Sequence, residues 1–168
     1  IMHKYFLFFL IIIGSCQKEE NRQNDNAFIN EQEFQRRIAH DELVESEEVH
    51  GYLYGTSRKI VEQTIAEGKM LLLEVDVKGG LAIKESFPNA TLAIFIMPPS
   101  EDELIRRLRN RGSDSEERIA KRLERMELET SYEPKYDITV VNEDLDEAVT
   151  AVLESIESKN QVKEEIWD

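Results

Sequence analysis

Hydrophobic residues along this chain fall into short continuous runs that alternate with segments of helical periodicity. The runs 70–77 and 91–97 are apolar at nearly every position and are bounded by glycine or proline, which is typical of strands buried on both faces. A further strand is expected at 136–141. Because the segments between the runs suit helices, the pattern predicts an α/β fold with a parallel sheet flanked by helices on both faces.

Capping residues and apolar spacing locate the helices. Phe34 and Ile38 lie four residues apart and predict a short helix at 31–40. Thr56 is expected to cap a helix that ends at Gly68. Further helices are expected at 81–87, from a Ser100–Glu103 capping box to a point before Gly112, from a second capping box at Ser113–Glu116, and at 145–156.

The first 27 residues differ in character from the rest. Residues 1–16 have a short basic start, an apolar run and small residues before Cys16, which is typical of a bacterial lipoprotein signal and makes Cys16 a lipidation candidate. The apolar run is shorter than the roughly 20 residues that a membrane-spanning helix needs, and the alternative is a buried strand. Residues 17–27 are interpreted as a polar linker and 158–168 as a charged tail.

Composition limits the classes of partner. A chain of 168 residues allows one domain. Its net charge of -14 argues against nucleic acid and against a membrane surface, unless Cys16 is lipidated. A single cysteine excludes an internal disulfide and a cysteine-rich metal site, and the histidines lack metal-ligand spacing. The oligomeric state is not indicated.

Two carboxylates end the first long apolar run. Glu74 and Asp76 are two residues apart, so on a strand they would share a face at its carboxyl end. Open α/β sheets bind their ligands at that end. Such carboxylates can hold Mg²⁺ through water or position a ribose or phosphate. The alternative is a solvated strand end.

A basic segment interrupts the acidic chain. Residues 106–125 contain eight basic and four acidic side chains. Arg118, Arg122 and Arg125 fall on one helical stripe, where guanidinium groups can clamp phosphate oxygens. The alternative is a solvated helix face that is partly neutralised by pairs such as Glu117 with Lys121.

Three residues of the segment 43–56 together suit a purine. A carboxylate such as Glu45 can accept from the N1 proton and the 2-amino group of guanine, which adenine cannot offer. Tyr54 can donate to a monophosphate oxygen, and Thr56 can donate to the base carbonyl. Each residue alone has an ordinary structural alternative, so only the combination favours a binding site.

The motifs EVHGYLYGT, EGKMLLLEVDVKGG and YDITVVNEDLDEA, with the segment FIMPPSEDELIRRLRNRGSDSEERIAKRL, give the chain a family resemblance. Residues 28–157 resemble guanylate kinase, the ATP:GMP phosphotransferase of purine nucleotide metabolism. The resemblance implies a P-loop-kinase-like core, a GMP-binding segment at 28–68, a mobile lid at 106–130 and Mg²⁺ bound with ATP. It also implies a cytoplasmic enzyme whose partners are GMP and ATP.

The resemblance also implies roles for individual residues. Glu45 and Thr56 would contact guanine, and Tyr54 would contact the GMP phosphate. Asp76 would lie in the metal and phosphate zone with Glu74 beside it, and would bind the metal indirectly through water. Arg111 and Arg122 would reach the transferring phosphoryl group from the lid, with Arg111 also binding ATP, and Asn142 would lie near the ATP adenine.

The chain departs from the family pattern before residue 28. The motif G-x-x-x-x-G-K-[ST] does not occur, and Asn26 stands where the family has a phosphate-binding tyrosine. We therefore expect a core that lacks its first strand and phosphate loop, in a truncated or rearranged kinase that is weakly active or inactive. The alternatives are a noncatalytic guanylate-kinase-like module that binds a nucleotide or a protein, possibly lipid-anchored, and a chimeric gene.

Overall fold

The fold is built on a four-stranded sheet with the order β4-β1-β5-β6. The computed structural model describes residues 8–13, 28–49, 51–110, 112 and 115–166. The strands of this sheet are β1 (Phe8–Ile13), β4 (Leu71–Val75), β5 (Thr91–Met97) and β6 (Ile138–Val141). A separate antiparallel hairpin consists of β2 (Leu43–Val49) and β3 (Tyr52–Ser57).

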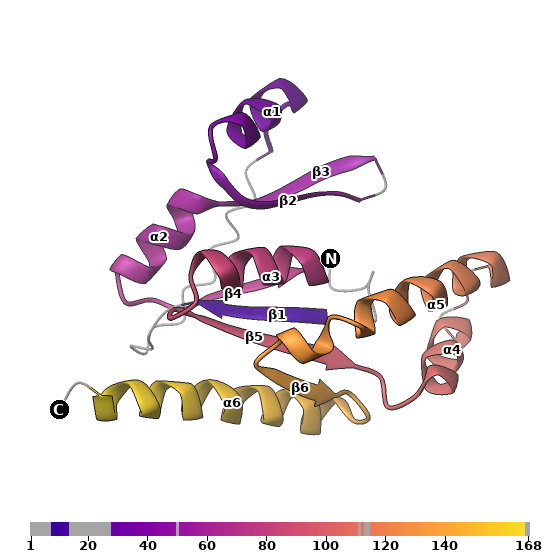
Figure 1. The fold of residues 1–168 in the computed structure, drawn as a ribbon. Coiled ribbons are helices and arrows are strands. Elements are labelled where there is room, and N and C mark those ends of the chain that lie inside the picture. Colours follow the sequence, from indigo (N-terminus) through magenta and orange to yellow (C-terminus); the bar gives the residue numbers. More distant parts are fainter. Residues whose placement is uncertain (1–7, 14–27, 50, 111, 113–114, 167–168) are drawn as a thin grey trace.

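Helices cover both faces of the sheet, as the sequence predicts. In Figure 1, α3 lies between the sheet and the β2–β3 hairpin, while α6 covers the opposite face. The helices α4 and α5 extend beyond one end of the sheet. Their bounds are α1 (Glu31–Ala39), α2 (Arg58–Ala66), α3 (Val77–Ser86), α4 (Glu101–Asn110), α5 (Glu116–Thr130) and α6 (Leu145–Ile166), with a short 3₁₀ helix at Glu133–Lys135.

The central strand β5 explains this layering. Successive strand residues face opposite sides, so Ala93 and Phe95 pack with α2 and α3 in one core, whereas Leu92 and Ile94 pack with α6 in the other. All four side chains are buried. The strand prediction at 91–97 is confirmed, since β5 spans these residues and buries apolar side chains on both of its faces.

The strand β1 lies between β4 and β5 and is antiparallel to both, whereas β5 and β6 are parallel. Three strands therefore share one direction, and β1 opposes them. The sequence analysis expected a core without its first strand, but β1 fills a place inside the sheet. Of the two interpretations of the N-terminal apolar run, a lipoprotein signal or a buried strand, residues Phe8–Ile13 form a strand. Cys16 and the linker 17–27 lie outside the described residues, and no described helix has the length and apolarity to cross a bilayer.

Three predicted helix starts are wrong. Thr56 lies in β3, and the residue before α2 is Ser57, whose side chain makes no capping bond. Helix α3 begins at Val77, four residues before the prediction, because Asp76 caps it. Helix α5 is capped by Ser115, whose side chain accepts from the backbone N–H of Arg118; the predicted cap Ser113 lies outside the described part.

Two other boundaries also differ. Strand β6 begins at Ile138 because the 3₁₀ helix occupies the residues just before Tyr136. Helix α6 continues to Ile166, ten residues beyond the predicted end. The remaining capping prediction is confirmed, since the N–H of Glu103 donates to Ser100 Oγ at 3.2 Å.

Candidate functional site

A carboxylate of the β2–β3 hairpin faces the first turn of α3. Glu45 and Thr56 are cross-strand partners in the hairpin, and the Thr56 hydroxyl donates to Glu45 Oε1 at 2.6 Å. Charge-assisted bonds of this kind are short and strong. The hydroxyl therefore fixes the rotamer of Glu45 instead of capping a helix.

Two glycines permit close approaches around Glu45. A Cβ at Gly79 would lie 2.9 Å from Asp76 Oδ1 and 3.1 Å from Glu45 Oε2. A Cβ at Gly55 would lie 2.9 Å from the backbone oxygen of Glu45. These spacings are too short for a side chain. Glycine at position 79 therefore permits the close approach of Glu45 to the start of α3, and glycine at position 55 permits the close approach of the two hairpin strands.

Asp76 follows β4 and begins α3. Its Oδ1 accepts from the N–H of Gly79 at 2.6 Å, as an N-cap does. Tyr136 contacts the same turn, because its hydroxyl donates to the carbonyl of Val77 at 3.1 Å. The Tyr136 ring packs edge-on against Phe95 of β5. Asp76 is therefore held rigidly at the carboxyl end of the sheet, where ligands bind in open α/β folds.

The carboxylates of this site affect one another. Burial raises the pKa of Glu45, and the charge of Asp76 raises it further, while the Thr56 hydrogen bond opposes both. Burial and Asp76 likewise raise the pKa of Glu47, whereas the nearby guanidinium of Arg125 lowers it. The site is therefore rich in negative charge and suits hydrogen-bond donors or a cation.

One arginine lies among these acidic groups. Arg125 Nε donates to Glu129 Oε1 at 2.5 Å, and its Nη2 lies 3.3 Å from Glu47 Oε1. Burial raises the pKa of Glu129, and Arg125 opposes that shift. The sequence analysis assigned no role to Glu47 or Glu129. A signal for each exists, since Glu47 is two residues from Glu45 on one strand and Glu129 is four residues from Arg125 on one helix.

The structure does not bring all the predicted site residues together. Glu45, Thr56 and Asp76 converge, but β4 ends at Val75, so the expectation that Glu74 and Asp76 lie on one strand is wrong. Leu71, Leu73 and Val75 pack in the core beneath α3. By alternation, Glu74 faces the opposite side of the sheet, and burial raises its pKa.

Most of the remaining predicted site residues lie on β3, on α5 or outside the described residues. Tyr54 is on β3 and 56% exposed, so its hydroxyl is accessible to a ligand. Arg122 is on α5, one helical turn before Arg125. Arg111 and Cys16 lie outside the described residues. No cluster of three or more metal-ligating side chains occurs in the described ranges.

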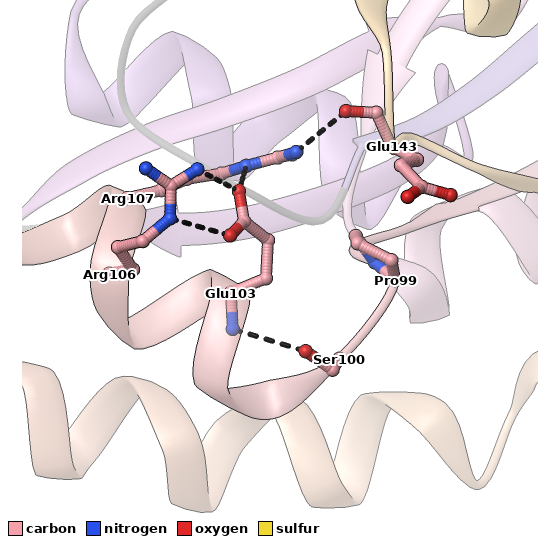
Figure 2. Close-up of a pocket in the computed structure, with 6 residues that line it drawn as sticks. All are labelled: Pro99, Ser100, Glu103, Arg106, Arg107 and Glu143. Atoms are coloured by element: carbon pink, nitrogen blue, oxygen red, sulfur yellow. Dashed lines mark hydrogen bonds and ion pairs between the residues drawn. The ribbon is translucent and has the colours of Figure 1, made fainter.

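A second candidate region lies at the start of α4. A pocket of about 400 Å³ is lined by the residues shown in Figure 2, namely Pro99, Ser100, Glu103, Arg106, Arg107 and Glu143. Arg107 donates to the carbonyls of Asn142 and Glu143 at 2.8 and 2.9 Å. Arg106 and Arg107 lower the pKa of Glu103 to about 2. The predicted ATP-binding residue Asn142 therefore lies beside this pocket, about which the sequence analysis made no prediction.

Comparisons with known proteins point to one family. The guanylate kinase family model matches residues 13–159. The chain is 46% identical to guanylate kinase of Escherichia coli K12 over 123 residues, which is 73% of this chain and 59% of that protein. It is 38% identical to guanylate kinase of Fusobacterium nucleatum over 152 residues, which is 89% of this chain and 82% of that protein.

A solved structure agrees with these matches. The crystal structure of guanylate kinase from Anaplasma phagocytophilum is similar with a TM-score of 0.65 at 30% identity, over 89% of this chain and 72% of that chain. The match to the Escherichia coli protein spans less than two thirds of that relative's length.

Proposed function

Because the chain belongs to the guanylate kinase family, we propose that it binds GMP between the β2–β3 hairpin and the start of α3, and that it serves the ATP-dependent phosphorylation of GMP to GDP. The observation that supports this proposal best is the half-buried carboxylate of Glu45. It is fixed by Thr56 and lies against Gly79, beside the cap residue Asp76.

Guanine is the base that this carboxylate suits. Its N1–H and 2-amino group can both donate to Glu45, whereas adenine has an acceptor at N1. The Thr56 hydroxyl holds the carboxylate in place, so little reordering is needed on binding. The exposed hydroxyl of Tyr54 would donate to the GMP phosphate. Sites that recognise a base through such polar groups strongly disfavour analogues that cannot pair with them.

The zone beyond the base would hold the phosphates. Asp76 suits Mg²⁺ held through water, because Mg²⁺ commonly uses few carboxylates together with substrate phosphates. When bound with ATP, the metal would neutralise charge on the phosphate oxygens. Arg122 on α5, with Arg111, would bind the transferring phosphoryl group, and Asn142 would place the adenine of ATP near the pocket at the start of α4.

Turnover by these 168 residues alone is expected to be slow. Phosphoryl transfer depends on positioning and on charge stabilisation, to which a glycine-rich phosphate loop and its lysine contribute strongly. The sequence lacks G-x-x-x-x-G-K-[ST]. This observation favours a second candidate function, a guanylate-kinase-like module that binds GMP without phosphorylating it. Because the reaction consumes ATP, a cytoplasmic location is part of the first proposal.

Calorimetric titration with GMP and AMP tests the binding proposal, with Glu45→Gln compared to Glu48→Gln. Glu48 is exposed on the same strand, so its substitution removes the same charge outside the site. We expect GMP to bind more tightly than AMP, and Glu45→Gln alone to weaken GMP binding roughly tenfold to a hundredfold, as the loss of a charged hydrogen-bond pair does. Equal affinity for the two nucleotides would contradict the proposal.

A coupled assay for ADP production from ATP, Mg²⁺ and GMP separates the two functions. The kinase function predicts turnover that depends on GMP and is lost in Arg122→Met. Binding of GMP without any turnover would support the noncatalytic module instead.

A further inference from the structure

We infer that Arg125 is a positioning residue for the guanine-binding carboxylate, because it ties the β2–β3 hairpin to the end of α5. This inference rests on the proposed function of Glu45. It concerns a contact between segments that are 78 residues apart in the sequence, and it assigns roles to Glu47 and Glu129 as the two ends of the tie.

The tie has one rigid end. Glu129 is only 8% exposed, on the last turn of α5, and accepts from Arg125 Nε at 2.5 Å. A buried carboxylate needs a charged partner, and the guanidinium of Arg125 supplies it. The pairing fixes the direction in which the guanidinium projects from the helix.

The other end of the tie is on the hairpin. Arg125 Nη2 lies 3.3 Å from Glu47 Oε1. Glu47 is two residues from Glu45 on β2, so the two side chains project from the same face of the strand. That face is turned toward α3, where Glu45 lies against Gly79 and the charge of Asp76 acts on both carboxylates.

The hairpin needs such a tie. It forms its own two-stranded sheet, with no backbone ladder to the four-stranded sheet among the described residues. Isolated two-stranded hairpins are marginally stable, so side-chain contacts must set the orientation of β2 relative to α3. Fixing Glu47 on the strand also fixes Glu45, because the strand backbone between them is extended and short.

Arginine is the side chain that this role requires. Its planar fork offers donors on two edges, so one group reaches Glu129 and Glu47 at once. A lysine ammonium at this position would preserve the charge but not the fork. Arg125→Lys is therefore expected to retain one contact and to give an intermediate effect.

The test compares GMP with IMP. The base of IMP lacks only the 2-amino group, which in GMP would donate a hydrogen bond to Glu45. The affinities of the full chain are measured by calorimetry for Arg125→Met and Glu47→Ala. The controls are Lys121→Met on the same helix and Glu48→Ala on the same strand. We expect the ratio of the IMP and GMP dissociation constants to fall about tenfold in the two tie variants and to stay unchanged in the controls.

A merely structural role predicts a different result. If Arg125 only stabilised the fold, its loss would weaken both nucleotides equally and leave the ratio unchanged, and that outcome would overturn the inference. Arg125→Lys should give an intermediate ratio, which keeps the test decisive if Arg125→Met unfolds.

Hydrogen exchange without nucleotide examines the tie itself. We expect faster exchange of the backbone amides in β2 and β3 in Arg125→Met and Glu47→Ala, and no change in the two controls. If the unmodified chain binds neither nucleotide, the proposed function fails, and exchange alone then decides whether the tie exists. Unchanged exchange in both tie variants would refute it.

Discussion

At the residue scale, binding and stability place opposite demands on Glu45. Its burial raises the pKa of the carboxyl above its usual value, so the folded state holds the proton more tightly than the unfolded state. Between the two pKa values the free energy of unfolding therefore falls as pH rises. At neutral pH the ionised Glu45 destabilises the fold, although guanine recognition requires that charge.

Glu45→Gln should therefore stabilise the protein at pH 7 while weakening GMP binding. We expect the Tm to rise, because the neutral amide avoids the cost of a partly buried charge. At pH 3 the advantage should disappear, because that pH lies below the ordinary pKa of a glutamate and Glu45 is then largely protonated in the folded and unfolded states. Scanning calorimetry at both pH values checks this, with Glu48→Gln as the control; a lower Tm for Glu45→Gln at pH 7 would contradict it.

At the scale of elements, Arg107 attaches α4 to the loop between β6 and α6. It donates to the carbonyls of Asn142 and Glu143, and its Nε donates to Glu103 Oε1 at 2.6 Å (Figure 2). These carbonyls follow the last strand and have no helical partner in α6, which begins at Leu145. The attachment therefore determines the position of the loop beside the pocket.

Arg107→Met is expected to lower the free energy of unfolding by about 2 kcal/mol, since it removes charged hydrogen bonds to two backbone carbonyls. Denaturant unfolding measures the change. Arg106→Met is the matched control, because Arg106 pairs with the same Glu103 but is 63% exposed, and exposed ion pairs contribute little. Equal losses in the two variants would show that the carbonyl contacts do not matter.

At the scale of the whole molecule, β1 joins the two halves of the sheet. Strands β4 and β5 each pair with β1 and not with each other. A central strand donates and accepts hydrogen bonds on both edges, so its loss would leave two unpaired edges within the core. Removal of residues 1–15, as lipoprotein processing before Cys16 would require, would remove this strand.

Ile11→Pro should abolish cooperative unfolding, because proline removes a ladder N–H and is excluded from central strands. Ile11→Val should retain a cooperative transition, since valine suits a strand equally well. Thermal unfolding followed by circular dichroism compares the two. A cooperative melt for Ile11→Pro, near that of the unmodified chain, would show that the sheet does not depend on β1.

Local patterns were sufficient for some of these features. The run 91–97 predicts β5 in full because its first five positions are buried and its last two are partly buried, so apolar residues continue along both faces. Glu45 and Thr56 could be named as one site because a hairpin brings positions 11 residues apart into register. The start of α3 was missed, although Asp76 and the glycines after it are a local signal of a helix cap.

The sequence by itself determined the alternation of strands and helices, the family and the hairpin carboxylate, because each depends on residues close together in the chain or on motifs. The tertiary structure decided the direction and neighbours of β1, since an apolar run fits either direction until its partners are known. It also separated Glu74 from Asp76 and joined Arg125 to Glu47 across 78 residues. Such contacts depend on how elements pack, and no local pattern records that.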